Sequence, residues 1–108
     1  MGLFKKHIPS FTPLEKKVKQ RSLNYENAHE KAEHVLRGLE ELEHIMLKNL
    51  GEKGAEALIK NELRKDFEFL NSRISLNHFD EVNACIKKIK DKIQSIVLSK
   101  NQLYFQHA

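Results

Sequence analysis

The feature that most constrains the fold of this chain is a long stripe of apolar residues at helical spacing in its first half. Apolar residues recur at steps of three and four from Leu14 to Met46, and Arg21 is the single polar interruption. The members of the stripe are Leu14, Val18, Tyr25, Ala28, Ala32, Val35, Leu39, Leu42 and Met46. This spacing places them on one face of an α-helix, and such a face is unfavourable in water. The stripe must therefore fold back, self-associate or dock on another protein.

The residues that flank the stripe predict where its helix begins and ends. Thr12 is a suitable N-cap, and Pro13 suits the first helical position. Residues 51–54 (Gly-Glu-Lys-Gly) stop the periodicity, because glycine readily adopts the backbone conformations that end helices. The sequence thus predicts one long helix over 13–50. A break near residues 21–24, where the stripe is weakest, is the alternative.

Two shorter apolar patterns predict two further helices, over 55–73 and 77–100. Residues 1–11 show no period and are interpreted as an irregular arm, and residues 101–108 are interpreted as a tail. The last helix has the cleanest pattern, with apolar residues at alternating steps of three and four. These residues are Phe79, Val82, Ile86, Ile89, Ile93 and Ile96.

Length and composition indicate a single all-α domain over residues 1–108. The chain is 31% charged and has four glycines, two prolines and no tryptophan, which is typical of helical proteins. In an up-down-up bundle, the two shorter helices would cover the first helix only from about residue 30 to residue 50. The predicted fold is an all-α, three-helix bundle with an unusually long first helix. Dimerisation would complete this bundle; alternatively, the start of the long helix folds back and makes a four-helix monomer.

Cysteine usage and hydropathy indicate the compartment. Cys85 is the only cysteine, so an internal disulfide cannot form and a reducing compartment is expected. The residue precedes a core position of the last predicted helix, whereas a catalytic thiol needs an exposed, electropositive setting. No charge-free stretch approaches the length of a membrane span, and the start does not resemble a signal peptide. The expected location is the cytoplasm, or a host cytosol reached without a cleavable signal peptide.

The residues that could bind a metal form no established motif. His29 and His34 are five residues apart, whereas the zinc-protease motif places two histidines four apart on one helical face. The pairs Glu26–His29 and Glu41–His44 have the spacing of di-iron bundles, but the other helices supply no matching pairs. The sequence therefore predicts a non-enzymatic protein with no cofactor and no metal. A metal-binding helical protein is kept as an alternative.

Basic residues are concentrated at the start of the chain, within residues 1–21, where Glu15 is the only acidic residue. Phe4 and Phe11 are available there to stack on bases. A basic-arm nucleic-acid-binding protein is therefore a second alternative, and the same arm is a candidate for docking on an anionic lipid surface. The basic residues are Lys5, Lys6, Lys16, Lys17, Lys19 and Arg21.

The first half of the stripe, before Ala32, has no predicted partner, and it coincides with the unbalanced basic charge. Tyrosine and arginine are favoured where binding energy concentrates in protein interfaces. The predicted partner-binding residues are Lys17, Val18, Arg21, Tyr25 and Ala28. Two copies would pair these halves antiparallel as a homodimer, or the surface would receive another protein. The primary prediction is a helical protein–protein interaction module, a regulator or inhibitor that docks on a partner enzyme.

The overall character of the chain resembles the small all-helical inhibitors that bacteria encode beside secreted ubiquitin-directed deamidases and transglutaminases. The resemblance covers the size, the helix content and a composition rich in lysine, asparagine and isoleucine, with the lone Cys85. It implies a non-catalytic protein that blocks an enzyme by occupying the surface where the substrate binds.

Overall fold

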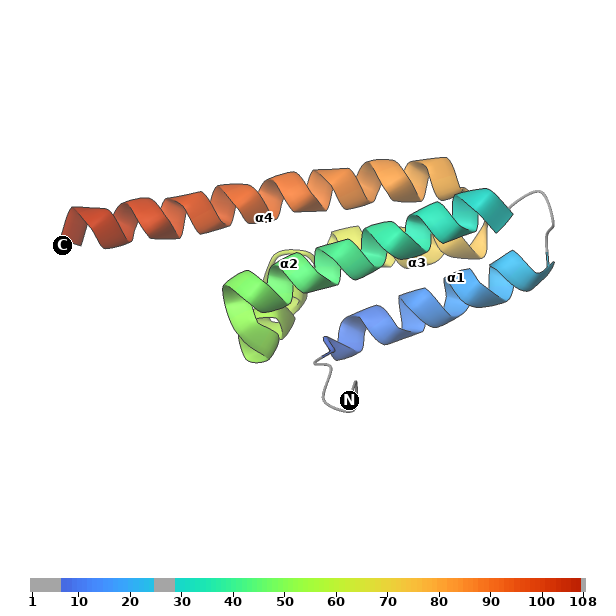
Figure 1. The fold of residues 1–108 in the computed structure, drawn as a ribbon, viewed down its shortest axis with the longest axis horizontal. Coiled ribbons are helices and arrows are strands. Elements are labelled where there is room, and N and C mark those ends of the chain that lie inside the picture. Colours follow the sequence, from blue (N-terminus) through green and yellow to red (C-terminus); the bar gives the residue numbers. More distant parts are fainter. Residues whose placement is uncertain (1–6, 25–28, 108) are drawn as a thin grey trace.

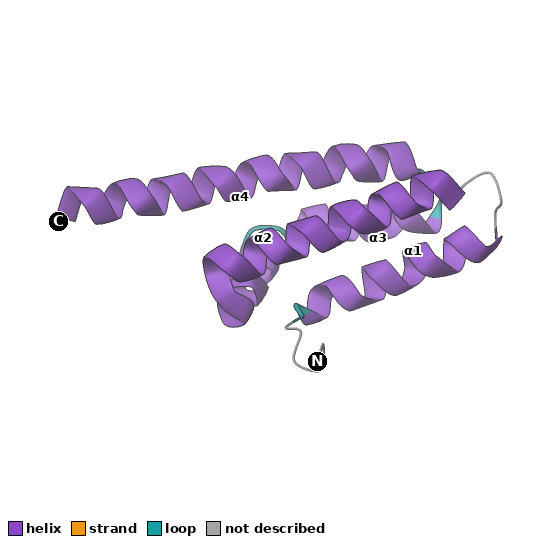
Figure 2. Cartoon of the chain, viewed as in Figure 1, coloured by secondary structure: helices purple, strands orange, loops and turns teal. Residues whose placement is uncertain are grey.

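The computed structural model describes the backbone of residues 7–24 and 29–107, and the side chains of residues 7–21 and 30–99. All the regular elements of the described part are helices, so the all-α prediction is confirmed (Figures 1 and 2). They pack as a bundle that contains one especially long helix. In chain order they are a short 3-10 helix η2 (Pro9–Phe11), α1 (Thr12–Asn24), α2 (His29–Asn61), α3 (Arg64–Ser75) and α4 (Phe79–His107).

The long stripe does not form one helix over 13–50. Its first part is α1, which ends at Asn24, and the rest is α2, which begins at His29. α1 lies beside α2 and α3 (Figure 1), so Leu14 and Val18 are buried against them. Burial of such side chains contributes about 1.5–3 kcal/mol each, which an extended helix would forgo. Residues 21–24, where the alternative placed a break, are the last turn of α1.

This folding back removes one argument for dimerisation. Pairing of two copies was predicted because the stripe through Val18 had no partner within one chain. α2 and α3 cover the stripe at Leu14 and Val18, whereas Tyr25 and Ala28 lie outside the described residues. The homodimer therefore stays a prediction. Leu14 and Val18 no longer support it, because both are buried within one chain.

A glycine changes the direction of α2 near its end. Gly51 has φ 72° and ψ 173°, a conformation that is essentially restricted to glycine. The sequence predicted that the helix stops at residues 51–54. The structure has a kink at Gly51 instead, and helical geometry resumes directly after it. Figure 1 shows the last turns of α2, in yellow-green, bending away from its long axis.

The helix predicted over 55–73 is also divided. α2 ends at Asn61 and α3 begins at Arg64. The backbone N–H groups of Glu62 and Leu63 both donate to the carbonyl oxygen of Leu58, at 2.8 and 3.1 Å. Leu63 is buried at this turn, so an apolar residue occupies the break and the periodicity continues through it. A break of this kind leaves no mark in the apolar pattern.

α4 begins at Phe79 and ends at His107, so the segment predicted as a tail over 101–108 is helical as far as residue 107. The predicted apolar pattern is confirmed from Phe79 to Ile93, where its residues are buried, and Ile96 is half-buried. The last turns of α4, in red in Figure 1, run beyond the ends of the other helices.

Candidate interaction surface

The structure places three of the five predicted partner-binding residues. Val18 is 1% exposed. The Nζ atom of Lys17 donates to Asn71 Oδ1 at 2.7 Å and to Ser75 Oγ at 2.8 Å, so this lysine joins α1 to α3. Arg21 is half-buried, and Tyr25 and Ala28 lie outside the described residues. A partner would reach Val18 only if α1 moved away from α2 and α3.

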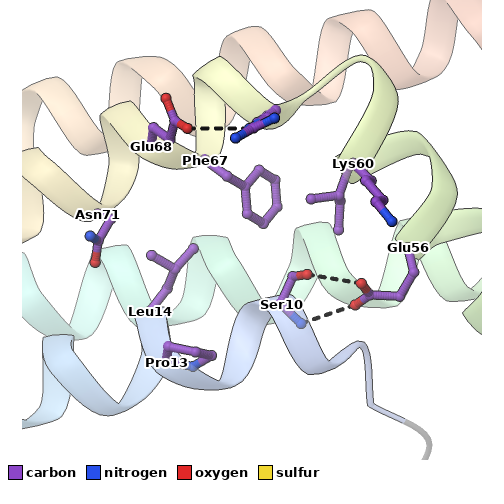
Figure 3. Close-up of a pocket in the computed structure, with 10 residues that line it drawn as sticks. Ser10, Pro13, Leu14, Glu56, Lys60, Phe67, Glu68 and Asn71 are labelled. Carbon is purple, nitrogen blue, oxygen red and sulfur yellow. Dashed lines mark hydrogen bonds and ion pairs between the residues drawn. The ribbon is translucent and has the colours of Figure 1, made fainter.

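A groove of about 640 Å³ lies where η2 and the start of α1 meet the end of α2 and α3 (Figure 3). Its volume is in the range of pockets that bind small molecules. Leu14, Ile59 and Phe67 make its apolar floor, and all three are buried. Each comes from a different helix, so the groove exists only when α1 is docked.

The floor is held in place by an aromatic pair. The ring of Phe67 on α3 packs edge-on against the ring of Phe11 in η2, with centroids 5.2 Å apart and an interplanar angle of 87°. This geometry is favoured for aromatic rings because the positive edge of one meets the negative face of the other. The position of Phe67 in the groove therefore depends on the docking of η2.

One side of the groove is fixed by a carboxylate of α2. The backbone N–H and the hydroxyl of Ser10 donate to the two carboxylate oxygens of Glu56, each at 3.0 Å (Figure 3). Hydrogen bonds to a charged acceptor are stronger than those between neutral groups. No pattern in the sequence predicts this pair, since the two residues are 46 positions apart in the chain and share no motif.

The other side of the groove carries Lys60, Arg64 and Glu68, so it holds two cationic groups and one carboxylate. Arg64 and Glu68 form an ion pair, with Nε 3.4 Å from Oε1, in which both side chains are exposed. Such a pair contributes little free energy and exchanges partners readily. Lys60 is exposed, and its Nζ atom has no hydrogen bond or ion pair with another described side chain. An acidic group entering the groove would therefore meet two cationic side chains able to bind it.

A pair of carboxyl groups lies on another side of α1. Glu43 of α2 is 7% exposed, and its Oε2 atom accepts a hydrogen bond from the backbone N–H of Ile8 at 2.9 Å. Burial raises the pKa of Glu15 to about 7, and the charge of Glu43 and a hydrogen bond with it act in the same direction. Two carboxylates cannot hydrogen-bond to each other, so this contact needs a shared proton. Without that proton the buried Oε1 atom of Glu15 has no donor among the described residues.

The described residues do not bring together a metal centre. They contain no group of three or more histidine, cysteine or acidic side chains with the geometry to hold an ion. The thiol of Cys85 is buried, with Sγ 3.8 Å from the carbonyl oxygen of Asp66. Burial raises the pKa of this thiol, and the charge of Asp66 raises it further. The thiol is thus held in its protonated, poorly nucleophilic form.

Two further findings concern the whole described chain. None of its helices combines the length and the apolar character needed to cross a membrane. Comparison with known protein families, with curated proteins and with solved structures found no match.

Proposed function

We propose that this chain is a non-enzymatic helical interaction module, a regulator or inhibitor that docks on a partner enzyme. The observation that carries the proposal is the groove between η2, α1, α2 and α3, which combines an apolar floor with cationic groups at its edge. Interfaces concentrate binding energy where an apolar anchor enters a pocket that excludes water.

The groove favours a particular kind of partner segment. An apolar side chain would contact Leu14, Ile59 and Phe67 on the floor. A carboxylate on the same segment would reach the Nζ atom of Lys60, and Arg64 would exchange Glu68 for it. Glu56 is already bound to Ser10, so it contributes less repulsion than a free carboxylate would. The expected partner surface is therefore an apolar residue beside an acidic one.

Charge inversion at one lysine tests this proposal. Tagged wild-type protein, Lys60→Glu and Lys48→Glu are used to recover partners from the source cell, with quantification by mass spectrometry. Lys48 is exposed on the same helix and does not line the groove, so the two variants change the net charge equally. The proposal expects a protein that the wild type and the Lys48→Glu variant recover equally and the Lys60→Glu variant recovers at least about tenfold less.

The recovered protein is then titrated calorimetrically against the same three chains. Equal affinity of all three for that protein would contradict the proposal. Recovery of nucleic acid in place of a protein, in amounts that fall with added salt, would favour the basic-arm nucleic-acid-binding alternative.

A further inference from the structure

Between residue 7 and the end of α1, the side-chain hydrogen bonds to the rest of the bundle are favourable, and one pair of carboxyl groups differs from them. Ile8 N–H donates to Glu43, Ser10 donates to Glu56, and Lys17 donates to α3. The exception is Glu15, which lines the same cavity as Glu43 at the interface of α1 and α2. Like charges at a partly buried contact disfavour each other, so this pair of carboxyl groups requires a proton to interact favourably.

The charged surroundings of this pair come from three elements. A cavity of about 430 Å³ beside Glu15 is lined by polar and charged side chains and by one leucine. The charge of Glu40 on α2 disfavours ionisation of Glu15, and the charge of His7 favours it. His7 Nδ1 also lies 3.7 Å from Glu43 Oε2. The charged and titratable groups that face the pair are His7 from the N-terminal segment, Lys19 from α1, and Glu40 and His44 from α2.

We propose that a single proton shared by Glu15 and Glu43 controls the docking of α1, and thereby whether the groove between η2, α1, α2 and α3 is formed. With the proton present, the two carboxyl groups hydrogen-bond and α1 stays against α2. When the proton is lost, two negative charges meet at the interface and a larger fraction of molecules releases α1. Release removes Ser10 and Leu14 from the groove. The consequence for partner binding rests on the proposed function, whereas the docking step does not.

The direction of the effect follows from the surroundings. A group that binds a proton more tightly when α1 is docked favours docking at low pH. Burial, Glu43 and Glu40 all disfavour the charged form of Glu15, and together they outweigh His7. Acidification therefore closes α1 onto the bundle, and alkalisation releases it.

A proton explains this site better than a bound cation does. The described residues offer no group of ligands with the geometry for a metal ion. The Oε2 atom of Glu43 is moreover occupied by the N–H of Ile8. Added Zn²⁺ should for that reason leave α1 docking unchanged.

Amide hydrogen exchange measured by mass spectrometry tests the proposal directly. α1 has 13 residues, and an isolated helix of this length is marginal in water, so its amides exchange once it leaves the bundle. In the wild type, exchange of α1 peptides divided by the intrinsic rate should rise about tenfold between about pH 5.5 and about pH 8. Exchange of peptides from the Phe79–Ile93 part of α4 serves as the internal reference.

Glu15→Gln is the decisive variant, because its amide can donate to Glu43 at every pH. The substitution also removes the negative charge that Glu15 carries in the first turn of α1 after it loses its proton, so the readout is the pH dependence and not the absolute rate. In this variant the rise with pH should disappear. It should persist in Glu52→Gln, a matched control at an exposed position of α2, and Leu14→Ala should raise α1 exchange equally at both pH values.

The outcomes test the proton-controlled docking of α1 separately from the proposed binding of a partner at the groove. A wild-type exchange ratio that does not change with pH, or an unchanged rise in Glu15→Gln, overturns the proton-controlled docking. Loss of the pH dependence on adding about 10 μM Zn²⁺ overturns the assignment to a proton alone. If Glu15→Gln removes the rise while Lys60→Glu and Lys48→Glu bind the recovered partner equally, the docking step stands and the proposed function fails.

Discussion

The carboxylate of Asp66 on α3 lies 2.8 Å from the Nζ atom of Lys92 on α4, and this ion pair joins the two helices at the edge of the core. Asp66 is among the few buried charged residues of the described part, whereas Lys92 is partly exposed. A buried carboxylate needs its partner because water cannot replace the lost interaction fully.

Lys92→Met should therefore destabilise the protein by about 1–3 kcal/mol, since it leaves Asp66 buried without its cation. Urea denaturation followed by circular dichroism measures the change. Lys88→Met is the matched control on the same helix, because Lys88 is exposed, and it should change the stability by less than about 0.5 kcal/mol. Equal losses in the two variants would show that the ion pair contributes nothing specific.

Gly51→Ala should destabilise the protein by about 1–3 kcal/mol, because the kink in α2 uses a backbone conformation that residues with a Cβ atom rarely adopt. A Cβ atom at this position would meet no neighbouring atom within 4 Å, so the loss would come from the backbone alone. Thermal unfolding should show a fall in Tm of several degrees. Glu52→Ala, at the next exposed position, should leave Tm nearly unchanged.

Val18→Asp distinguishes the two interpretations of this residue. Val18 is buried in α1. A charged aspartate there should therefore lower the stability by more than about 3 kcal/mol, or release α1 from the bundle. As part of a free partner-binding surface, this position would tolerate the change. Urea denaturation is the measurement, and Lys16→Asp at an exposed position of α1 is the control.

The stability of the whole protein should fall as the pH rises through neutrality. The pKa of Glu15 is raised from 4.5 to about 7 in the folded state. Its stabilising contribution is therefore complete below about pH 4.5 and is lost as the pH rises through about 7. Urea midpoints at about pH 5 and about pH 8 should differ in the wild type, and by less in Glu15→Gln, because only the wild type titrates at this site.

Cys85 should react slowly with thiol reagents in the native protein. Its thiol is buried and its pKa is raised, so both access and the thiolate fraction are low. Alkylation by iodoacetamide at about pH 8 should be at least about tenfold slower than in urea-unfolded protein. A native rate equal to the unfolded rate would place the thiol at the surface.

Apolar periodicity predicted which residues are buried better than it predicted where the helices end. The pattern from Phe79 to Ile93 belongs to one helix and was predicted correctly. The turn at Leu63 escaped prediction because its buried leucine keeps the period through the break. Periodicity reports which face is buried and does not report whether the helix is continuous.

The candidate site was much less predictable than the helices. The pairs Ser10–Glu56 and Glu15–Glu43 form only because α1 folds back onto α2. The sequence is compatible both with one continuous helix over 13–50 and with a start that folds back, because the apolar spacing suits either arrangement. Interactions between distant side chains follow from the packing of helices and leave no local signal in the sequence.

The kink at Gly51 has a consequence for how this protein tolerates change. The turns that follow it carry both Glu56 and Lys60, so the backbone conformation of Gly51 sets the position of both residues in the groove. Gly51 has no side chain and nothing near the place where one would be. The shape of the groove is thus controlled from a position that would contact no partner, and substitutions there would alter recognition without touching the recognised molecule.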